Sequence, residues 1–211
     1  MTLRDKLYDV SEKMHQHILS QPGVELIETE DFGWENYRYS SPDFRLAHVE
    51  RFFHDNLLVV HVTVFPHKNN PAPIYGFDVV ASEKAGKIMG AFVDYSPVCY
   101  ELHWHSETWA KDRKLPVWAT VFSKKFVAIR PEEDEHDKLF NFGYEKFIDF
   151  FDVIKVKPDD VYIDKVIEKQ NAYCEYQSKN PKTYAALKHK IGAEKATYFM
   201  TQVLFPKIEE E

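Results

Sequence analysis

Residues 44–66 read FRLAHVERFFHDNLLVVHVTVFP, and residues 74–81 read IYGFDVVA. Both stretches are rich in Val, Phe and Ile with polar residues between them, which is typical of β-strands. Asp55-Asn56 is a two-residue turn signal inside the first stretch. The sequence therefore predicts strands over residues 45–53, 57–65 and 74–81, joined as antiparallel neighbours, with a fourth strand over 87–95.

Tight connections between these strands fix which residues stand opposite one another. If the turn pairs His54 with Leu57, then His61 lies opposite Glu50. If the next connection pairs residue 65 with residue 74, then His61 also lies opposite Asp78. Directly opposed residues point to the same face of a sheet, so these three groups form one row. A slip of one residue in either hairpin would break the row.

The row has two physical interpretations. His61 and Asp78 stand in apolar strands, where ionisable groups are paired, shifted in pKa, or both. One interpretation is a proton relay in which Asp78 acts as an acid and His61 exchanges protons near neutral pH. The other is a structural ion pair that bridges the strands, since such pairs also shift pKa values. His48 stands two residues before Glu50, on the same face.

The remainder of the chain is mostly helical. Apolar residues recur at three- and four-residue steps over residues 3–18. Further helices are predicted over 137–153, 160–177 and 193–205, and another begins with Asn180 as N-cap and Pro181 in the first turn. Residues 115–130 add another strand or two. This order predicts one α+β domain over residues 1–211, with helices packed on an antiparallel sheet.

Composition and charge exclude several classes of protein. The 211 residues are 44% hydrophobic and 15% aromatic, which disfavours disorder, and the net charge of −7 disfavours nucleic-acid binding. No apolar stretch could span a membrane, and the N-terminal segment does not resemble a signal peptide. With two isolated cysteines, the expected location is the cytoplasm. Residues 108–130 and 176–195 are basic, which suits either a solvated surface or an anionic partner.

Other candidate sites are weaker. His15 and His17 do not share a helix face and are expected at the surface. His103-Trp104-His105 could place two imidazoles on one side of a strand, but no acidic third ligand accompanies them. No glycine-rich phosphate loop or nucleophile elbow is present. Cys99 and Cys174 are expected to be core residues.

Several segments taken together resemble the ferredoxin-dependent bilin reductases. The likeness covers about residues 25 to 205 and rests on these motifs: 44–50 FRLAHVE, 60–66 VHVTVFP, 73–80 PIYGFDVV, 94–97 DYSP, 113–118 RKLPVW, 126–131 FVAIRP, 179–183 KNPKT and 200–205 MTQVLF. No single motif is specific, but the ordered set is. A fully unrelated α+β domain would require the whole set to be accidental.

The resemblance implies a fold, a reaction and partners. The family fold is a three-layer α/β/α sandwich with a central antiparallel sheet. Its members reduce biliverdin IXα, an open-chain tetrapyrrole, with single electrons from reduced [2Fe-2S] ferredoxin, through bilin radicals and without a bound metal or flavin. Haem oxygenase would supply the substrate upstream. We expect a monomer, because no long edge strand or apolar helix face is left without a partner.

The resemblance also gives roles to individual residues. Asp78 corresponds to the central proton donor at the bilin, with His61 hydrogen-bonded to Asp78 and to the lactam. Glu50 corresponds to the group that protonates the exovinyl substituent of ring D, and His48 supports that end. Arg113 and Lys182 correspond to residues that contact the propionates.

The product is the least determined feature. Four-electron reduction is favoured over two-electron reduction. Asn180 and Glu50 match the residues at these positions in phycocyanobilin-forming members of the family. Met89 and Val93 are expected to alter the pocket, so phycocyanobilin is only slightly favoured over phycoerythrobilin. Two other functions are open. One is a bilin carrier without turnover, and the other is the related reductase of red chlorophyll catabolite, whose reaction does not use the His61–Asp78 pair.

Overall fold

A computed structural model describes residues 1–102, 104, 109–114, 120–156 and 162–209. Within these ranges, eight strands form one sheet in the order β1-β2-β3-β4-β5-β6-β8-β7, and every neighbouring pair is antiparallel. The strands are β1 (Glu25–Leu26), β2 (Glu35–Ser40), β3 (Phe44–His54), β4 (Leu57–Pro66), β5 (Ile74–Ser82), β6 (Lys87–Ser96), β7 (Lys111–Asp112) and β8 (Val127–Arg130).

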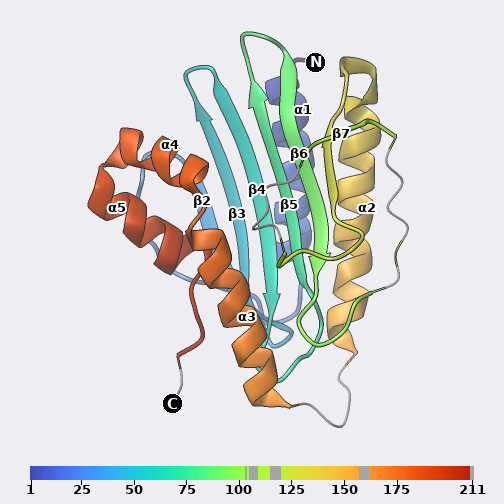
Figure 1. Cartoon of the computed structure of the whole chain (residues 1–211), viewed down its shortest axis with the longest axis vertical. Helices are drawn as coiled ribbons and strands as arrows, with labels where there is room; N and C mark the ends of the chain where they lie inside the picture. Colours follow the sequence, from blue (N-terminus) through green and yellow to red (C-terminus); the bar gives the residue numbers. More distant parts are fainter. Residues whose placement is uncertain (103, 105–108, 115–119, 157–161, 210–211) are drawn as a thin grey trace.

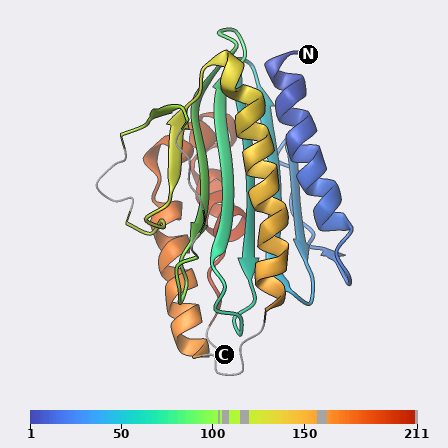
Figure 2. The same cartoon turned by 90° about the vertical axis from the view of Figure 1, so that its right-hand side faces the viewer.

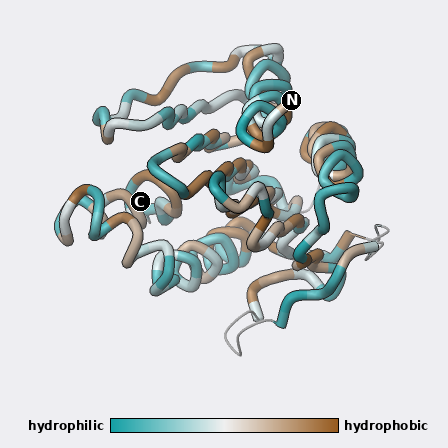
Figure 3. The backbone as a smooth tube through the Cα atoms, turned by 90° about the horizontal axis from the view of Figure 1, so that it is seen from above, coloured by the Kyte–Doolittle hydropathy of each residue, from teal (hydrophilic) through white to brown (hydrophobic). Residues whose placement is uncertain are grey.

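Helices cover both faces of this sheet. One face carries α1 (Leu3–Leu19) and α2 (His136–Lys155), which follows the short η1 (Glu133–Glu135). The opposite face carries α3 (Ile163–Ser178), α4 (Pro181–Ile191), α5 (Ala193–Tyr198) and the π-helical turn η2 (Phe199–Leu204). Figures 1 and 2 show the two layers, and Figure 3 shows the sheet between them from above. The predicted α+β class with a three-layer arrangement is confirmed.

Alternation along the strands produces two separate cores. Val60, Val62 and Val64 of β4 point toward α1 and α2 and are fully buried. Phe65 and its neighbours on the other face pack against the C-terminal helices, where Phe199 is also fully buried. Because side chains alternate between faces, each core needs every second residue of a strand. Both faces of the central strands are therefore covered, at least in part.

The predicted register is confirmed in both hairpins. Asp55 has a φ of 49°, in the left-handed region that aspartate tolerates, and the turn pairs His54 with Leu57. Glu50 pairs with His61, and His61 pairs with Asp78. The three ionisable groups therefore stand in one row across β3, β4 and β5.

Four features differ from the expectations. The strands β1, β2 and β7 are not predicted: β1 and β7 have two residues each, and ENYRYS of β2 lacks apolar alternation. In the segment from 115 to 130, residues 115–119 lie outside the described ranges, and β8 is shorter than expected. His15 is not at the surface: it is 7% exposed and hydrogen-bonds Tyr39 at 2.7 Å, because α1 packs this side against the sheet. The last helix changes to π-helical geometry at Phe199.

No helix in the described ranges combines the length and the apolar character required to cross a membrane.

Candidate active site

The acid–base row lies on the sheet face beneath the C-terminal helices. Glu50, His61 and Asp78 are consecutive partners, and the row continues to Phe92 of β6. Opposed residues in antiparallel strands have Cβ atoms about 5 Å apart. Within this row the charge of Asp78 acts on Glu50, two strands away.

Glu50 is a buried carboxyl with one hydrogen-bond donor. Glu50 is 6% exposed, and its Oε1 accepts a hydrogen bond of 2.8 Å from the indole Nε1 of Trp34. Burial raises the pKa of Glu50 to about 8; the Trp34 hydrogen bond opposes this shift and the negative charge of Asp78 adds to it. At neutral pH Glu50 therefore carries a proton that it can donate.

His61 is held in the neutral form. Burial lowers the pKa of His61 to about 4. Its Nδ1 is buried and has no hydrogen-bond partner among the described residues. The imidazole packs edge-on against Phe205, with ring centroids 5.9 Å apart. A neutral imidazole with an unpartnered nitrogen can hydrogen-bond a ligand.

Asp78 is half-buried, and its pKa is raised to about 7 by burial, against which the positive charge of Arg113 acts. A carboxyl that titrates near neutral pH can both give and receive a proton. In the described structure His61 and Asp78 make no hydrogen bond to each other. The strand register alone brings them together, as directly opposed residues of β4 and β5.

His48 extends the site along β3. It is fully buried, and its Nε2 lies 2.5 Å from Oδ1 of Asn36 on β2. Burial lowers the pKa of His48 well below its ordinary value, and the nearby His61 and Arg38 add to this effect. The ring centroid is 5.7 Å from that of His61, so two neutral imidazoles lie side by side.

Arg113 reaches the other end of the row. Its backbone N–H donates to the carbonyl of Ala128 on β8 at 2.8 Å, which brings the side chain over the ring of Phe92 at 5.1 Å. Gly90 provides the necessary space, because a Cβ at this position would lie 1.9 Å from Nη1 of Arg113. Asp78 and Arg113 are near enough that each charge shifts the pKa of the other.

The remaining predicted site residues lie around this row in different ways. Asn180 is the N-cap of α4 and accepts a hydrogen bond of 3.1 Å from the backbone of Lys182, as the sequence predicts; Lys182 itself is exposed. Met89 is 43% exposed, and its carbonyl accepts a hydrogen bond from Arg113. Val93 differs: it pairs with Phe77 and is buried in the core on the α1–α2 face, because odd-numbered residues here point away from the row. Val93 does not line this face.

Sequence reasoning missed several residues of the site. Trp34 and Asn36 were not identified as site residues because β2 was not predicted. Their position beside Glu50 follows once β2 is paired with β3. Gly90 carried a weak signal as a lone glycine inside a strand, which often marks a close approach. Phe205 belongs to the 200–205 motif, but the motif did not reveal its contact with His61, which depends on the π-helical turn.

Asp94 of β6 is a buried carboxyl that binds two serines. It is 3% exposed and accepts hydrogen bonds from the hydroxyls of Ser96 and Ser123 at 2.6 and 2.5 Å, and from the backbone of Ser123 at 3.0 Å. Burial raises the pKa of Asp94 to about 6 against these bonds. Asp94 of the DYSP motif thus ties β6 to Ser123, just before β8.

In the described ranges, no group of three or more His, Cys, Asp or Glu residues could hold a metal ion. His103 and His105, the sequence candidates, lie outside those ranges.

The fold and the row define a class: an α/β/α sandwich whose sheet presents desolvated acid–base groups beneath a helical layer. The sequence profile of the ferredoxin-dependent bilin reductases matches residues 8–206. The chain belongs to the ferredoxin-dependent bilin reductase family and is an oxidoreductase of this class.

Individual relatives agree with this assignment. The phycocyanobilin:ferredoxin oxidoreductase of a Synechococcus species is 30% identical over 198 residues, which cover 85% of this chain and 78% of that protein. The enzyme of the same name from Prochlorococcus marinus is 30% identical and covers 94% and 91%. Among solved structures, PcyX gives a TM-score of 0.67 at 25% identity and covers 97% and 98%. Tomato phytochromobilin synthase in complex with biliverdin shares the fold, with a TM-score of 0.68 at 15% identity over 94% and 80%.

The raised pKa of Glu50 predicts a specific pH dependence of stability. An unfolded glutamate titrates near pH ~4.3, whereas folded Glu50 titrates at about 8. Between these values the folded state holds a proton that the unfolded state has lost, so this group removes up to about 1.4 kcal/mol of unfolding free energy per pH unit as the pH rises. Glu50→Gln should lack this loss.

Urea unfolding between about pH 5 and about pH 8 measures the difference. The stability of Glu50→Gln relative to the wild type should rise with pH, whereas Glu28→Gln, at an exposed site, should run parallel to the wild type. A constant difference between Glu50→Gln and the wild type would contradict a proton held on Glu50.

Proposed function

We propose that this chain reduces biliverdin IXα by four electrons to a phycobilin, with the tetrapyrrole bound against the Glu50–His61–Asp78 face. The observation that carries the proposal is the confirmed register, which places three proton-exchanging groups in one row. Electrons come singly from reduced [2Fe-2S] ferredoxin, and the chain contributes protons, position and exclusion of water. Four electrons require four protons, so a series of acid–base groups suits the chemistry.

Each member of the row has a distinct role in this proposal. Asp78, with a pKa of about 7, donates the central proton and is then reprotonated from solvent. His61, held neutral, hydrogen-bonds the lactam edge of the substrate and relays a proton. Glu50, protonated at neutral pH, serves the exovinyl group of ring D, and His48 supports that end. Protonation that accompanies each electron keeps negative charge from accumulating in a desolvated site.

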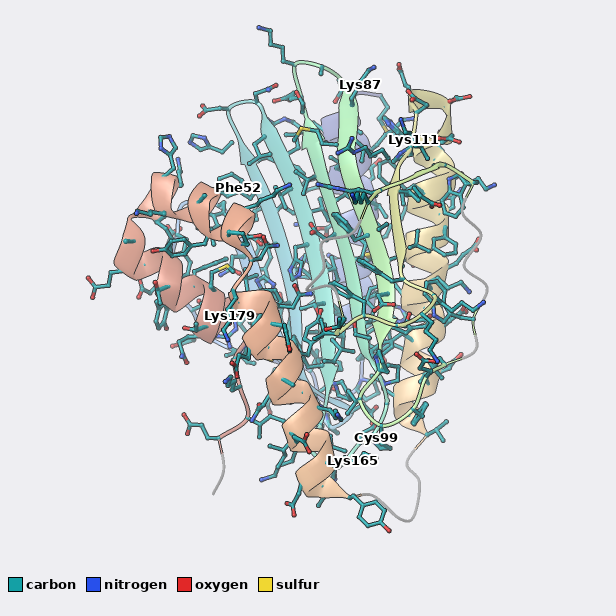
Figure 4. The ribbon with its side chains drawn as sticks, in the orientation of Figure 1. Phe52, Lys87, Cys99, Lys111, Lys165 and Lys179 are labelled. Atoms are coloured by element: carbon teal, nitrogen blue, oxygen red, sulfur yellow. The ribbon has the colours of Figure 1, made fainter. Side chains whose placement is uncertain are left out.

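Basic residues at the edge of the site suit the acidic groups of the substrate and partner. In this proposal Arg113, beside Asp78, and the exposed Lys182 contact the propionates. Lys87 and Lys111 lie toward the same end of the sheet (Figure 4), in a region that would attract an acidic ferredoxin. Such charges raise the rate of encounter more than they raise affinity.

Phycocyanobilin is slightly favoured as the product over phycoerythrobilin. Glu50 can protonate the exovinyl group of ring D. Position 180 is an asparagine that caps α4, so it supplies no second carboxyl. The curated relatives at 30% identity carry the name phycocyanobilin:ferredoxin oxidoreductase. Met89, whose carbonyl accepts from Arg113, stays a candidate substrate contact, whereas Val93 is left out because it faces the other core.

The decisive experiment is an anaerobic assay with biliverdin IXα, ferredoxin, ferredoxin reductase and NADPH, followed by absorbance and product chromatography. A blue product that co-elutes with phycocyanobilin is expected. A pink product would support the same class of reaction but show that the proton is added to a different carbon. Binding with unchanged absorbance over many turnovers would overturn the enzymatic proposal and favour a bilin carrier.

Replacement of the central acid should stop the reaction between electrons. Asp78→Asn retains the shape of the site but cannot donate the proton, so the bilin should bind, accept the first electron and remain as a radical. We expect turnover to fall by at least about a hundredfold. Anaerobic electron paramagnetic resonance with parallel absorbance measures the stalled species. Asp55→Asn, in the β3–β4 turn, makes the same chemical change away from the row and should behave as the wild type. Normal turnover in Asp78→Asn would contradict the assigned role.

Gly90 gives an indirect test of the propionate contact. Gly90→Ala would place its Cβ 1.9 Å from Nη1 of Arg113 and so displace the guanidinium. We expect the fold to be retained and the affinity for biliverdin to fall about fivefold, as in Arg113→Gln. Fluorescence quenching measures binding, and Lys84→Gln removes a charge at the β5–β6 turn as a control. Unchanged affinity in both Gly90→Ala and Arg113→Gln would exclude this contact.

A further inference from the structure

Trp34 makes the only hydrogen bond to the Glu50 side chain among the described residues. We propose that Trp34 is a positioning residue that fixes the orientation of the Glu50 carboxyl and so determines which carbon of the substrate receives its proton. This inference rests on the proposed function, because it assumes that Glu50 donates a proton to the bilin. The contact itself can be tested without substrate.

A glycine turn places the indole beside Glu50. Gly33 has a φ of 86°, a conformation that favours glycine, and its N–H donates to Oδ1 of Asp31 at 2.7 Å. The turn leads directly into β2, whose register pairs Asn36 with Glu50. Trp34 stands two residues before Asn36 and therefore on the same face, opposite Phe52. Figure 4 shows Phe52 on this part of the sheet.

Three rings prevent the indole from turning away. Its centroid lies 5.6 Å from that of Phe32, 5.1 Å from that of Phe52 and 5.2 Å from that of Phe199, the last two in edge-on geometry. Phe199 is fully buried and begins the π-helical turn η2. The indole N–H is thus held by the helical layer as well as by the sheet.

The hydrogen bond makes the two carboxyl oxygens of Glu50 unequal. Oε1 accepts from the indole, whose nitrogen can only donate. When Glu50 is protonated, Oε1 acts as the carbonyl oxygen, so the proton resides on Oε2. Removal of the indole N–H would allow either oxygen to carry the proton and the carboxyl to rotate. Because the proton then leaves from Oε2 alone, it is delivered to one carbon of the substrate.

The first test is the titration of Glu50 in the ligand-free protein. Trp34→Phe retains an aromatic ring but removes the donor that favours the ionised carboxyl, so the titration midpoint of Glu50 should rise by about one pH unit. Infrared difference spectra measure the carboxyl band, which Glu50→Gln assigns. Trp109→Phe is the control, because the Trp109 N–H has no hydrogen-bond partner in the described structure.

A second measurement needs no folded variant of Trp34. In the wild-type protein, the indole N–H resonance that reports the contact should move with pH at the midpoint of Glu50, about 8. The resonance of Trp109 should not follow this midpoint. An unmoved midpoint in Trp34→Phe, or no indole resonance that follows Glu50, would overturn the inference.

The third test is the product. In the anaerobic assay, Trp34→Phe should raise the ratio of the minor to the major bilin roughly fivefold, in line with the loss of one hydrogen bond. If Glu50→Gln changes the products and Trp34→Phe does not, the inference is overturned while the proposed role of Glu50 stands. If Glu50→Gln leaves the products unchanged, the proposed role of Glu50 fails, and the inference fails with it even where the titration shows the contact.

Discussion

The pairing of β3, β4 and β5 is the constraint on which the site depends. Because side chains alternate along a strand, a shift of one residue in either hairpin would send His61 or its partners into the opposite core. That core is fully buried and apolar, with Val60 and Val62 of β4 packed toward α1 and α2. The hydrophobic cost of a slip therefore protects the alignment of Glu50, His61 and Asp78.

Desolvation converts this alignment into chemistry. Burial beneath the C-terminal helices, complete at Glu50 and partial at His61 and Asp78, raises the pKa values of both carboxyls and lowers that of His61. The result is two acids that hold protons near neutral pH and a neutral imidazole between them. The turn η2 contributes at both ends: Phe199 packs on the indole above Glu50, and Phe205, just after η2, packs on His61. Such π-helical turns frequently occur at functional sites.

The sequence was sufficient for the central part of the molecule and insufficient for its edges. Strong alternation and a short turn determine β3 to β6, so the row could be predicted from two hairpins. The strand β2 carries polar residues on both faces and becomes recognisable only through its partner, which concealed Trp34 and Asn36. Val93 was misplaced because its face depends on the register with Phe77. The placement of Gly90 under Arg113 is a tertiary contact between β6 and the residue that follows β7.

A crystal structure of this chain with biliverdin IXα tests the central claim most directly. We expect the tetrapyrrole to lie on the sheet face beneath α3 and η2, with its nitrogens and lactam oxygens within hydrogen-bond distance of Asp78 and His61, and with ring D at Glu50. A bilin bound elsewhere, or on this face without contact to Asp78, would contradict the account, whatever the activity of the protein.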